Sequence, residues 1–358
     1  MSADQARGYG LEGVNAADTR ISHVDGERGQ LVIANRDVEE LAVGGTFEEV
    51  AQAVLDAGRS SPLALATRLR HARLAAWELV PRLGDALSAT DGMEALRAGL
   101  SHLWATGDDD ADAIAAIGAA PVLVAAWSRT RRRLAPVAPS AEYDHPTDYL
   151  RMTTGVVPEV AAAKALGAYL ITVIDHGMNA STFTARVIAS TASDLISAVV
   201  GAVGALKGPL HGGAPGPVLD MLDAIGTSTN AEAWLLAELA AGHRIMGMGH
   251  RIYRVRDPRA AVLELAVKPL KTARLALAHA VESAAAKILR ERKPDRPLAA
   301  NVEFYTAVLL DAVGLPREQF SPTFAVGRIA GWCAHVLEQR RTGKLIRPAS
   351  TYVGSLPS

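Results

Sequence analysis

The sequence has little that could cross-link the chain or bind a metal through cysteine. Its 358 residues include one cysteine, Cys333, which excludes an intrachain disulfide and a cysteine zinc cluster. A single cysteine fits a reducing compartment, and we expect a cytoplasmic protein. No cluster of residues at metal-ligand spacing is evident, so no metal site is expected.

The chain also lacks an excess of charge of either sign and a long uninterrupted apolar run. The net charge is −1, so bulk electrostatics predict neither a nucleic acid nor a membrane as a partner. Asp4, Arg7 and Glu12 interrupt the start, where a secretory signal would be apolar. The most apolar stretch, residues 111–127, is shorter than the roughly 20 residues of a membrane span and contains Pro121. We expect a buried helix there.

Aromatic residues make up only 5% of the chain, and long β-branched runs are few. Alanine and leucine are abundant instead, which predicts an all-α protein. The only good strand signals are at residues 21–24 and 30–33, on either side of a polar, glycine-containing turn. We therefore expect a small N-terminal β-hairpin on a large helical body, with a smaller lobe inserted around residues 212–310.

Local signals place the ends of several helices. Thr46 and Glu49 form a capping box that opens one helix, and Gly58 stops it. Ser-Pro at 61–62 predicts the start of a longer helix reaching Leu79. Residues 321–341 predict one long amphipathic helix.

A histidine lies in the Gly/Pro-rich loop Lys-Gly-Pro-Leu-His-Gly-Gly-Ala-Pro at residues 207–215. Pro215 or Pro217 is placed to be the first residue of the next helix. The partial positive charge at a helix start disfavours imidazolium, so His211 is expected to stay neutral and donate an N–H. Taken alone, the stretch is more typical of a surface loop, because such Gly/Pro loops are common.

Three other clusters carry polar groups that packing alone does not require. Residues 176–182 begin with a histidine and continue with Asn, Ser and Thr, a run that is also a good N-cap. Residues 246–259 alternate glycine with methionine and then crowd His250 with arginines, which suits a polyanion or a dicarboxylate. Glu303 lies among apolar neighbours at 301–305, where burial would raise its pKa toward that of a general base. An ordinary carboxylate at a helix start is the simpler interpretation of the last cluster.

Together these clusters resemble the citrate synthase family over nearly the whole chain. The matching segments occur in the family's order at residues 10–14, 25–26, 176–186, 208–215, 247–259, 301–305, 331–338 and 347–348. The resemblance implies a citrate synthase-like two-domain helical homodimer that acts in the tricarboxylic acid cycle. A large domain, residues 1–211 and 311–358, and a small mobile domain, residues 212–310, would close over oxaloacetate and acyl-CoA. It implies no cofactor, because acyl-CoA is a substrate.

The resemblance also implies roles for individual residues. His211 would stabilise the enolate of the thioester, Glu303 would remove the α-proton, and His250 would polarise the oxaloacetate carbonyl. The residues implied to bind oxaloacetate are His176, His250, Arg259, Arg328 and, from the partner subunit, a residue matching Arg347. The residues implied to bind CoA are Met246, Gly247, Met248, Gly249 and Arg254.

One position departs from the family pattern. The family's usual base is an aspartate, whereas this chain has Glu303. The carboxylate is kept, but its reach grows by one methylene. We expect a citrate synthase that uses acetyl-CoA. The alternatives are a 2-methylcitrate synthase that uses propionyl-CoA and a non-catalytic paralogue that binds CoA and a dicarboxylate.

Overall fold

The computed structural model describes residue 11 and residues 13–58, 65–211, 215–292 and 298–355. Parts of the predicted motifs lie outside these residues. They are Gly10, Glu12, the predicted helix start at 61–62, and positions 212–214 of the His211 loop.

The structure is mostly helical, as predicted. The N-terminal half carries α1 (Val38–Gly44), α2 (Phe47–Ala57), α3 (Leu65–Trp77), α4 (Gly92–Leu100), α5 (Asp109–Arg131), α6 (His145–Thr154), α7 (Val160–Val173), α8 (Ala180–Ser190) and α9 (Leu195–Leu206). The remainder carries α10 (Gly216–Ile225), α11 (Ala231–Ala240), α12 (Pro258–Val267), α13 (Ala273–Arg292), α14 (Val302–Ala312) and α15 (Phe320–Thr342).

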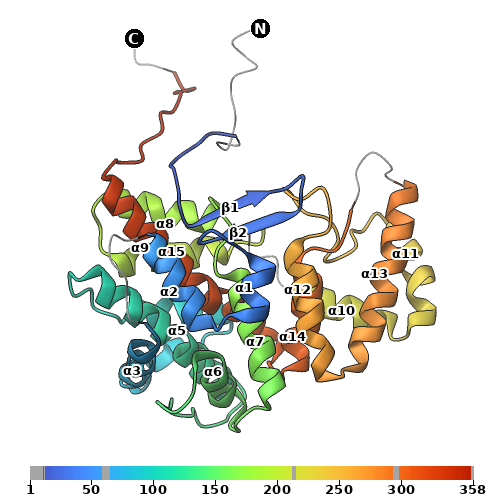
Figure 1. Ribbon diagram of the computed structural model, residues 1–358, viewed down its shortest axis with the longest axis horizontal. Helices are drawn as coiled ribbons and strands as arrows, with labels where there is room; N and C mark the ends of the chain where they lie inside the picture. Colours follow the sequence, from blue (N-terminus) through green and yellow to red (C-terminus); the bar gives the residue numbers. More distant parts are fainter. Residues whose placement is uncertain (1–10, 12, 59–64, 212–214, 293–297, 356–358) are drawn as a thin grey trace.

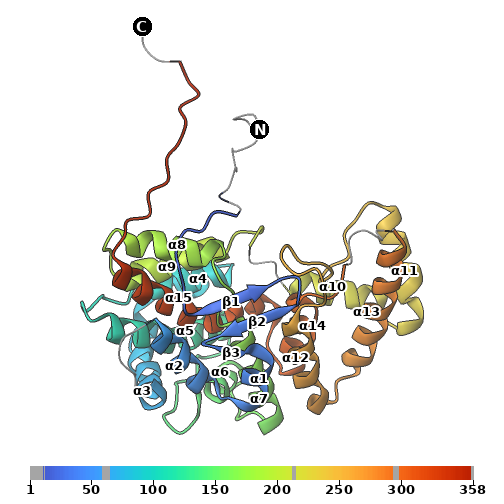
Figure 2. The same ribbon diagram turned by 45° about the horizontal axis from the view of Figure 1, so that its top comes forward.

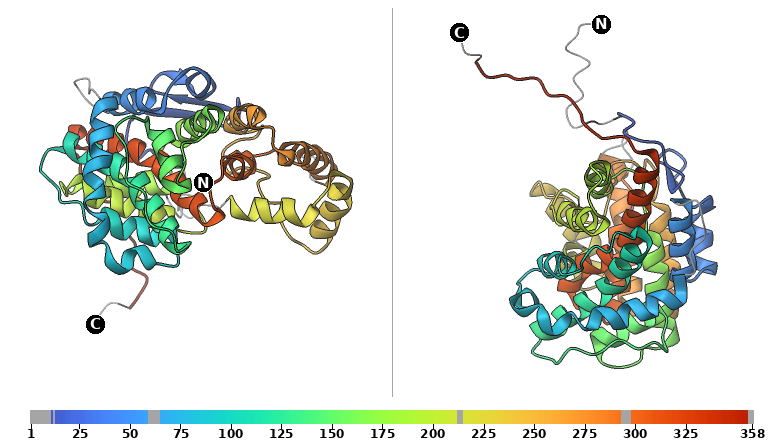
Figure 3. Two further views of the ribbon diagram at one scale, coloured as in Figure 1. Left: turned by 90° about the horizontal axis from the view of Figure 1, so that it is seen from below. Right: turned by 90° about the vertical axis from the view of Figure 1, so that its left-hand side faces the viewer.

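The helices gather into a larger body and a smaller group beside it. Figures 1 and 2 show α10, α11 and α13 on one side of the molecule, with α12 and α14 between them and the larger body. The view from below in Figure 3 shows the same separation. The sequence analysis divided the chain into a large domain, residues 1–211 and 311–358, and a small domain, residues 212–310. This division stays a prediction, as does the mobility of the small domain.

The predicted hairpin is confirmed and is part of a slightly larger sheet. Strand β1 (Ser22–Asp25) pairs antiparallel with β2 (Gln30–Ile33), and a short β3 (Arg36–Asp37) pairs with β2. The hairpin turn packs onto the segment around His250. A Cβ on Gly26 would collide with the carbonyl oxygen of Ile252. The glycine is therefore required by a close backbone approach.

Local signals placed the helix ends well, with two small corrections. The capping box of α2 is present in full, with Glu49 N–H donating to Thr46 Oγ1 and Thr46 N–H to Glu49, and Gly58 is the C-cap. Helix α3 ends at Trp77, so the expected extension to Leu79 is wrong. Helix α10 begins at Gly216, between the two prolines proposed as its first residue.

The predicted amphipathic character of α15 is wrong. Trp332, Cys333 and His335 are fully buried, and burial continues around the helix for most of its length. Helices α2, α5, α7, α8 and α9 pack against it, so no side of it is left to form a solvent-facing stripe. Helix α5 is buried as expected. It is long and apolar enough to cross a membrane by length and composition, but most of it is covered by the protein itself.

Gly331 on α15 lies directly against the end of α7. A Cβ at this position would collide with the carbonyl oxygen of Ile174, a backbone atom that cannot rotate away. Replacing Gly331 by Ala is expected to lower the free energy of unfolding by about 1–3 kcal/mol, measured by urea denaturation. Gly44→Ala is the matched control, because no atom lies within 4 Å of a Cβ there. Equal stability of the two variants would contradict this packing argument.

Candidate active site

The glycine-rich segment before His250 is fixed to the start of α14. Met248 forms a β-bridge with Ala300, and Gly249 N–H donates to the carbonyl of Ala299 at 2.7 Å. Gly247 and Gly249 have φ of +72° and +87°, a backbone conformation that favours glycine. The predicted CoA-binding segment, Met246 to Gly249, therefore lies beside the helix start that carries Glu303.

His250 is held in one tautomer by the backbone that follows it. Its Nδ1 accepts hydrogen bonds from the N–H groups of Ile252 at 3.0 Å and Tyr253 at 3.1 Å. A nitrogen that accepts two N–H groups carries no proton, so the proton of the neutral ring is on Nε2. Burial, assisted by the Arg259 charge, lowers the pKa of His250 to about 4. The residue is thus a neutral Nε2–H donor.

His176 follows α7 and lies next to His250. The two ring centroids are 5.6 Å apart, and His176 Nε2 is 3.1 Å from the hydroxyl of Tyr253. Burial and the charges of Arg259 and Arg328 hold the pKa of His176 well below its usual value. Tyr253 was not assigned a role from the sequence, although it lies in the predicted cluster and contacts both histidines.

His211 is in the opposite tautomer. It follows α9, and its Nε2 accepts the backbone N–H of Ser181 at 3.2 Å and lies 2.8 Å from the Ser181 hydroxyl. The neutral ring therefore carries its proton on Nδ1. Burial and the Arg328 charge lower the pKa of His211 to about 4. Trp332 Nε1–H donates to the same hydroxyl at 3.1 Å, which ties the ring to α15.

Arg259 is buried at the start of α12 and is fixed by Asp257, two residues earlier. Its Nε and Nη2 donate to the two carboxylate oxygens of Asp257 at 3.0 and 2.7 Å. Asp257 also accepts the backbone N–H of Val302, so one carboxylate joins the starts of α12 and α14. A local signal for this cap is present in the sequence, because Asp before Pro is a common N-cap. The bonds leave Nη1 of Arg259 unused by Asp257.

Arg328 is buried on α15 and reaches the end of α7. Its Nε donates to the carbonyl oxygen of Val173. Burial lowers the pKa of its guanidinium to about 10, against the opposing effect of the Asp175 carboxylate, so it stays charged at neutral pH. Its charge also lowers the pKa of His176 and His211, which places all three groups in one electrostatic environment.

Glu303 occupies the first turn of α14. The N-cap Asn301 accepts its backbone N–H at 2.9 Å, which sets the direction of the helix start. Its Oε2 is buried and has no hydrogen-bond partner among the described residues. Burial raises the pKa of Glu303 to about 8, against the lowering effect of Arg259 and Arg328. This carboxyl has the properties of a general base that is poised near neutral pH.

The structure brings together six of the predicted residues and separates two. The gathered residues are His176, His211, His250, Arg259, Arg328 and Glu303. The Arg254 side chain is exposed, and its backbone N–H donates to the carbonyl of Gly26. Arg347 is exposed on the segment after α15, which projects away from the body in Figures 1 and 2.

A buried polar chain that the sequence did not predict supports the His176 segment. Asp175 accepts from Ser22 Oγ and from Gly177 N–H, and its Oδ1 lies 3.2 Å from His335 Nε2. His335 Nδ1 in turn accepts from Arg186 at 2.9 Å, and Arg186 donates to Glu338 at 2.7 Å. The segment that carries His176 is therefore held from α15 as well as from the sheet.

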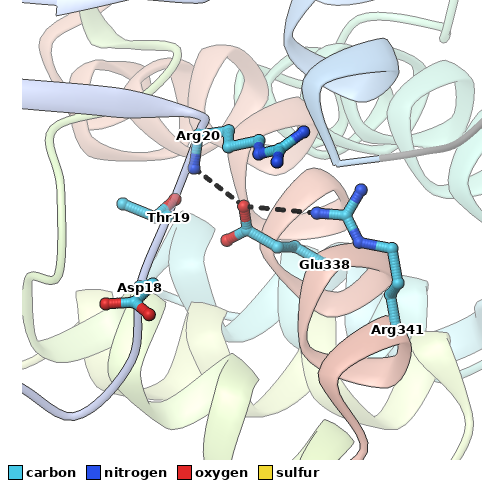
Figure 4. A pocket seen from close by; sticks show the side chains of 5 residues that line it. All are labelled: Asp18, Thr19, Arg20, Glu338 and Arg341. Atoms are coloured by element: carbon cyan, nitrogen blue, oxygen red, sulfur yellow. Dashed lines mark hydrogen bonds and ion pairs between the residues drawn. The ribbon is translucent and has the colours of Figure 1, made fainter.

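The outer end of this chain reaches a surface pocket. Figure 4 shows Glu338 between Arg20 and Arg341, with Asp18 and Thr19 completing the lining. None of these five residues belongs to the gathered cluster. Within the described part of the chain, no group of three His, Cys, Asp or Glu side chains is arranged to hold a metal ion.

Comparison with known proteins gives a consistent result across the chain. The family model described as citrate synthase, C-terminal domain, matches residues 10–349. A Mycobacterium tuberculosis protein provisionally named citrate synthase 2 is 40% identical, with 97% of this chain and 93% of that protein covered. A 2-methylcitrate synthase of the same organism is 36% identical, covering 96% of this chain and 90% of that protein.

Solved structures agree with the sequence relatives. Citrate synthase from Thermotoga maritima superposes with a TM-score of 0.83 at 33% identity, covering 98% of this chain and 96% of that one. A ternary complex of carboxymethyl coenzyme A and oxaloacetate with citrate synthase from Thermoplasma acidophilum gives a TM-score of 0.84 at 25% identity, covering 98% and 96%.

Proposed function

The chain belongs to the citrate synthase family and is a citrate synthase-type acyltransferase, and we propose that it condenses acetyl-CoA with oxaloacetate to give citrate and CoA. The observation that carries this proposal is the combination at one place of a buried carboxyl, two neutral histidines and two buried arginines. The solved relative with oxaloacetate and carboxymethyl coenzyme A supports this pair of substrate classes. A role in the tricarboxylic acid cycle follows as part of the same proposal.

The polar groups match the chemistry of the first step. A thioester α-proton is weakly acidic, so its removal needs a base together with a donor to the developing enolate oxygen. Glu303 supplies the carboxylate, and the Nδ1–H of His211 supplies the donor. The Nε2–H of His250 would then polarise the ketone of oxaloacetate, where the new carbon–carbon bond forms.

The cations match the second substrate. Oxaloacetate is a dianion, and planar guanidinium groups bind carboxylates with two parallel hydrogen bonds. Arg259 and Arg328 are buried and already fixed by Asp257 and Val173, so that little side-chain freedom is lost on binding. His176, neutral and buried beside His250, would complete the oxaloacetate site.

We also propose a cytoplasmic homodimer in which Arg347 reaches the site of the partner subunit. The segment after α15 projects from the body, and its apolar residues Leu345, Tyr352 and Val353 are 56%, 69% and 91% exposed. A second copy of the chain would cover them. Light scattering that gives the mass of a single chain at micromolar concentration would rule out this arrangement.

The test of the proposed function is release of the CoA thiol by the purified protein with oxaloacetate. Acetyl-CoA and propionyl-CoA are compared separately, since one methylene is worth only about 1–3 kcal/mol of discrimination. Faster turnover with acetyl-CoA supports the proposal. Preference for propionyl-CoA makes the protein a 2-methylcitrate synthase, the activity named for its 36% identical relative. No release with either, in protein that binds oxaloacetate, indicates a non-catalytic paralogue.

The pH dependence of the reaction should follow Glu303. A base must be deprotonated to act, and burial raises the pKa of this carboxyl to about 8. We therefore expect kcat/KM to rise by about 10-fold per pH unit below the pKa of Glu303 and to level off near pH 9. His211 and His250, with pKa values of about 4, stay neutral over this range. A flat profile between pH 6 and 9 would contradict the assignment of the base.

A further inference from the structure

Two buried polar atoms, one on the candidate base and one on a neighbouring helix, have no hydrogen-bond partner among the described residues. One is Oε2 of Glu303, and the other is the hydroxyl oxygen of Tyr169, a fully buried residue on α7. Neither makes a hydrogen bond to any other described residue. Helix α7 packs directly against α14, which carries Glu303. A buried polar atom left unsatisfied costs about 1–3 kcal/mol, so a functional reason for keeping both is needed.

Other buried tyrosines in the protein have partners. The hydroxyl of Tyr149 lies 2.8 Å from Thr323 Oγ1 and accepts from Gln319 Nε2 at 2.9 Å. The hydroxyl of Tyr305 donates to the carboxylate of Glu282. Tyr169 therefore differs from the tyrosines that serve packing and local bonding alone.

The surroundings of Tyr169 are those of the candidate site. Burial raises the pKa of its hydroxyl well above the usual value, and the charge of Glu303 is the next largest cause. Tyr149 adds to this, and Arg328 and Arg259 oppose it. The hydroxyl thus stays protonated, and among charged groups the carboxyl of Glu303 acts on it most strongly.

We propose that Tyr169 is a positioning residue for Glu303, and that its hydroxyl donates a hydrogen bond to Oε2 of the ionised carboxylate when substrates are bound. This inference rests on the proposed function. With Oε2 held, Oε1 faces the substrate and takes the α-proton of the acyl group. The electron pair of the C–H bond forms the C=C bond of the enolate, and the carbonyl π pair moves to the thioester oxygen. The Nδ1–H of His211 stabilises the negative charge on that oxygen by a hydrogen bond. A glutamate has one more rotatable bond than the family's aspartate, so it gains more from such a support.

The pH profile separates this role from a merely structural one. The charged or titratable groups that act on Glu303 are Arg259 and Asp257 near the start of α12, Arg328 on α15 and Tyr169 on α7. In Tyr169→Phe the two arginines and Asp257 remain. Loss of a donor to the carboxylate should move the rising limb of kcat, which reports the pKa of groups in the enzyme–substrate complex, to higher pH by about 1–2 units. The KM for oxaloacetate should stay unchanged.

Tyr149→Phe is the matched control, because it also removes a buried tyrosine hydroxyl but one that bonds only to Thr323 and Gln319. It should leave the pH profile unshifted. An unshifted profile in active Tyr169→Phe protein would overturn the proposal, and so would a raised KM for oxaloacetate without a shift, since Tyr169 would then contact the substrate instead. Failure of the proposed function is distinct, because the unmodified protein would then release no thiol.

A second variant covers the case in which Tyr169→Phe does not fold. 3-Fluorotyrosine placed at position 169 keeps the hydroxyl and nearly the same shape but makes it a stronger donor. The rising limb should then move to lower pH, whereas the same substitution at position 149 should leave it in place. A limb that does not move with fluorotyrosine at 169 would overturn the proposal.

Discussion

Glu303→Gln is expected to lower kcat by about 10²–10⁴-fold, the range that general base catalysis contributes. The amide has almost the same shape as the carboxyl but cannot take a proton. Thiol release with saturating acetyl-CoA and oxaloacetate measures the loss. Oxaloacetate binding, measured by calorimetry, should be retained, because Arg259, Arg328 and His176 are unchanged. A Gln variant with full activity would show that another group is the base.

Glu303→Asp is the matched control for this experiment. It keeps the carboxylate and places the family's usual residue at the position, but it shortens the reach by one methylene. A displacement of about 1 Å in a reacting group can cost on the order of 100-fold in rate. Activity above that of the Gln variant is therefore expected. Equal loss in both variants would mean that the position of the carboxyl matters more than its charge.

We expect different substitutions to retain activity at the two catalytic histidines, namely Asn at His211 and Gln at His250. The amide nitrogen of Asn lies near the place of a histidine Nδ1, and that of Gln near Nε2. His211 uses Nδ1–H as its donor, because Nε2 accepts from Ser181. His250 uses Nε2–H, because Nδ1 accepts from Ile252 and Tyr253. We therefore expect His211→Asn and His250→Gln to retain more activity than His211→Gln and His250→Asn.

The size of the difference follows from the role of each donor. Removing one preorganised donor to a developing oxyanion costs about 10²–10³-fold in kcat. The tolerated member of each pair should keep part of that factor, whereas the other member should lose all of it. All four variants are compared by kcat for thiol release, with circular dichroism to check folding. The reverse order at either histidine would show that its tautomer differs from the one in this structure.

Much of the architecture follows from short stretches of the sequence. The Thr46 capping box and the Asp and Asn residues before α12 and α14 act through groups only two or three positions away. Low aromatic content and abundant alanine indicated helices, and the polar turn at residues 25–29 indicated the hairpin. The capping box, the helical content and the hairpin are local features, so the sequence alone was sufficient to predict them. The order of the motifs then indicated the family.

Other features depend on residues that are far apart in the chain. Helix α15 is buried because helices from several parts of the chain pack around it, which its own periodicity does not report. The donor atom of His211 is set by Ser181, thirty residues earlier. The charge of Glu303 acts on Tyr169 because α7 packs on α14. Burial and hydrogen-bond partners are properties of the folded assembly of elements. The sequence by itself indicated which residues we propose to carry the chemistry, whereas only the tertiary structure decided their protonation, tautomers and hydrogen-bond partners.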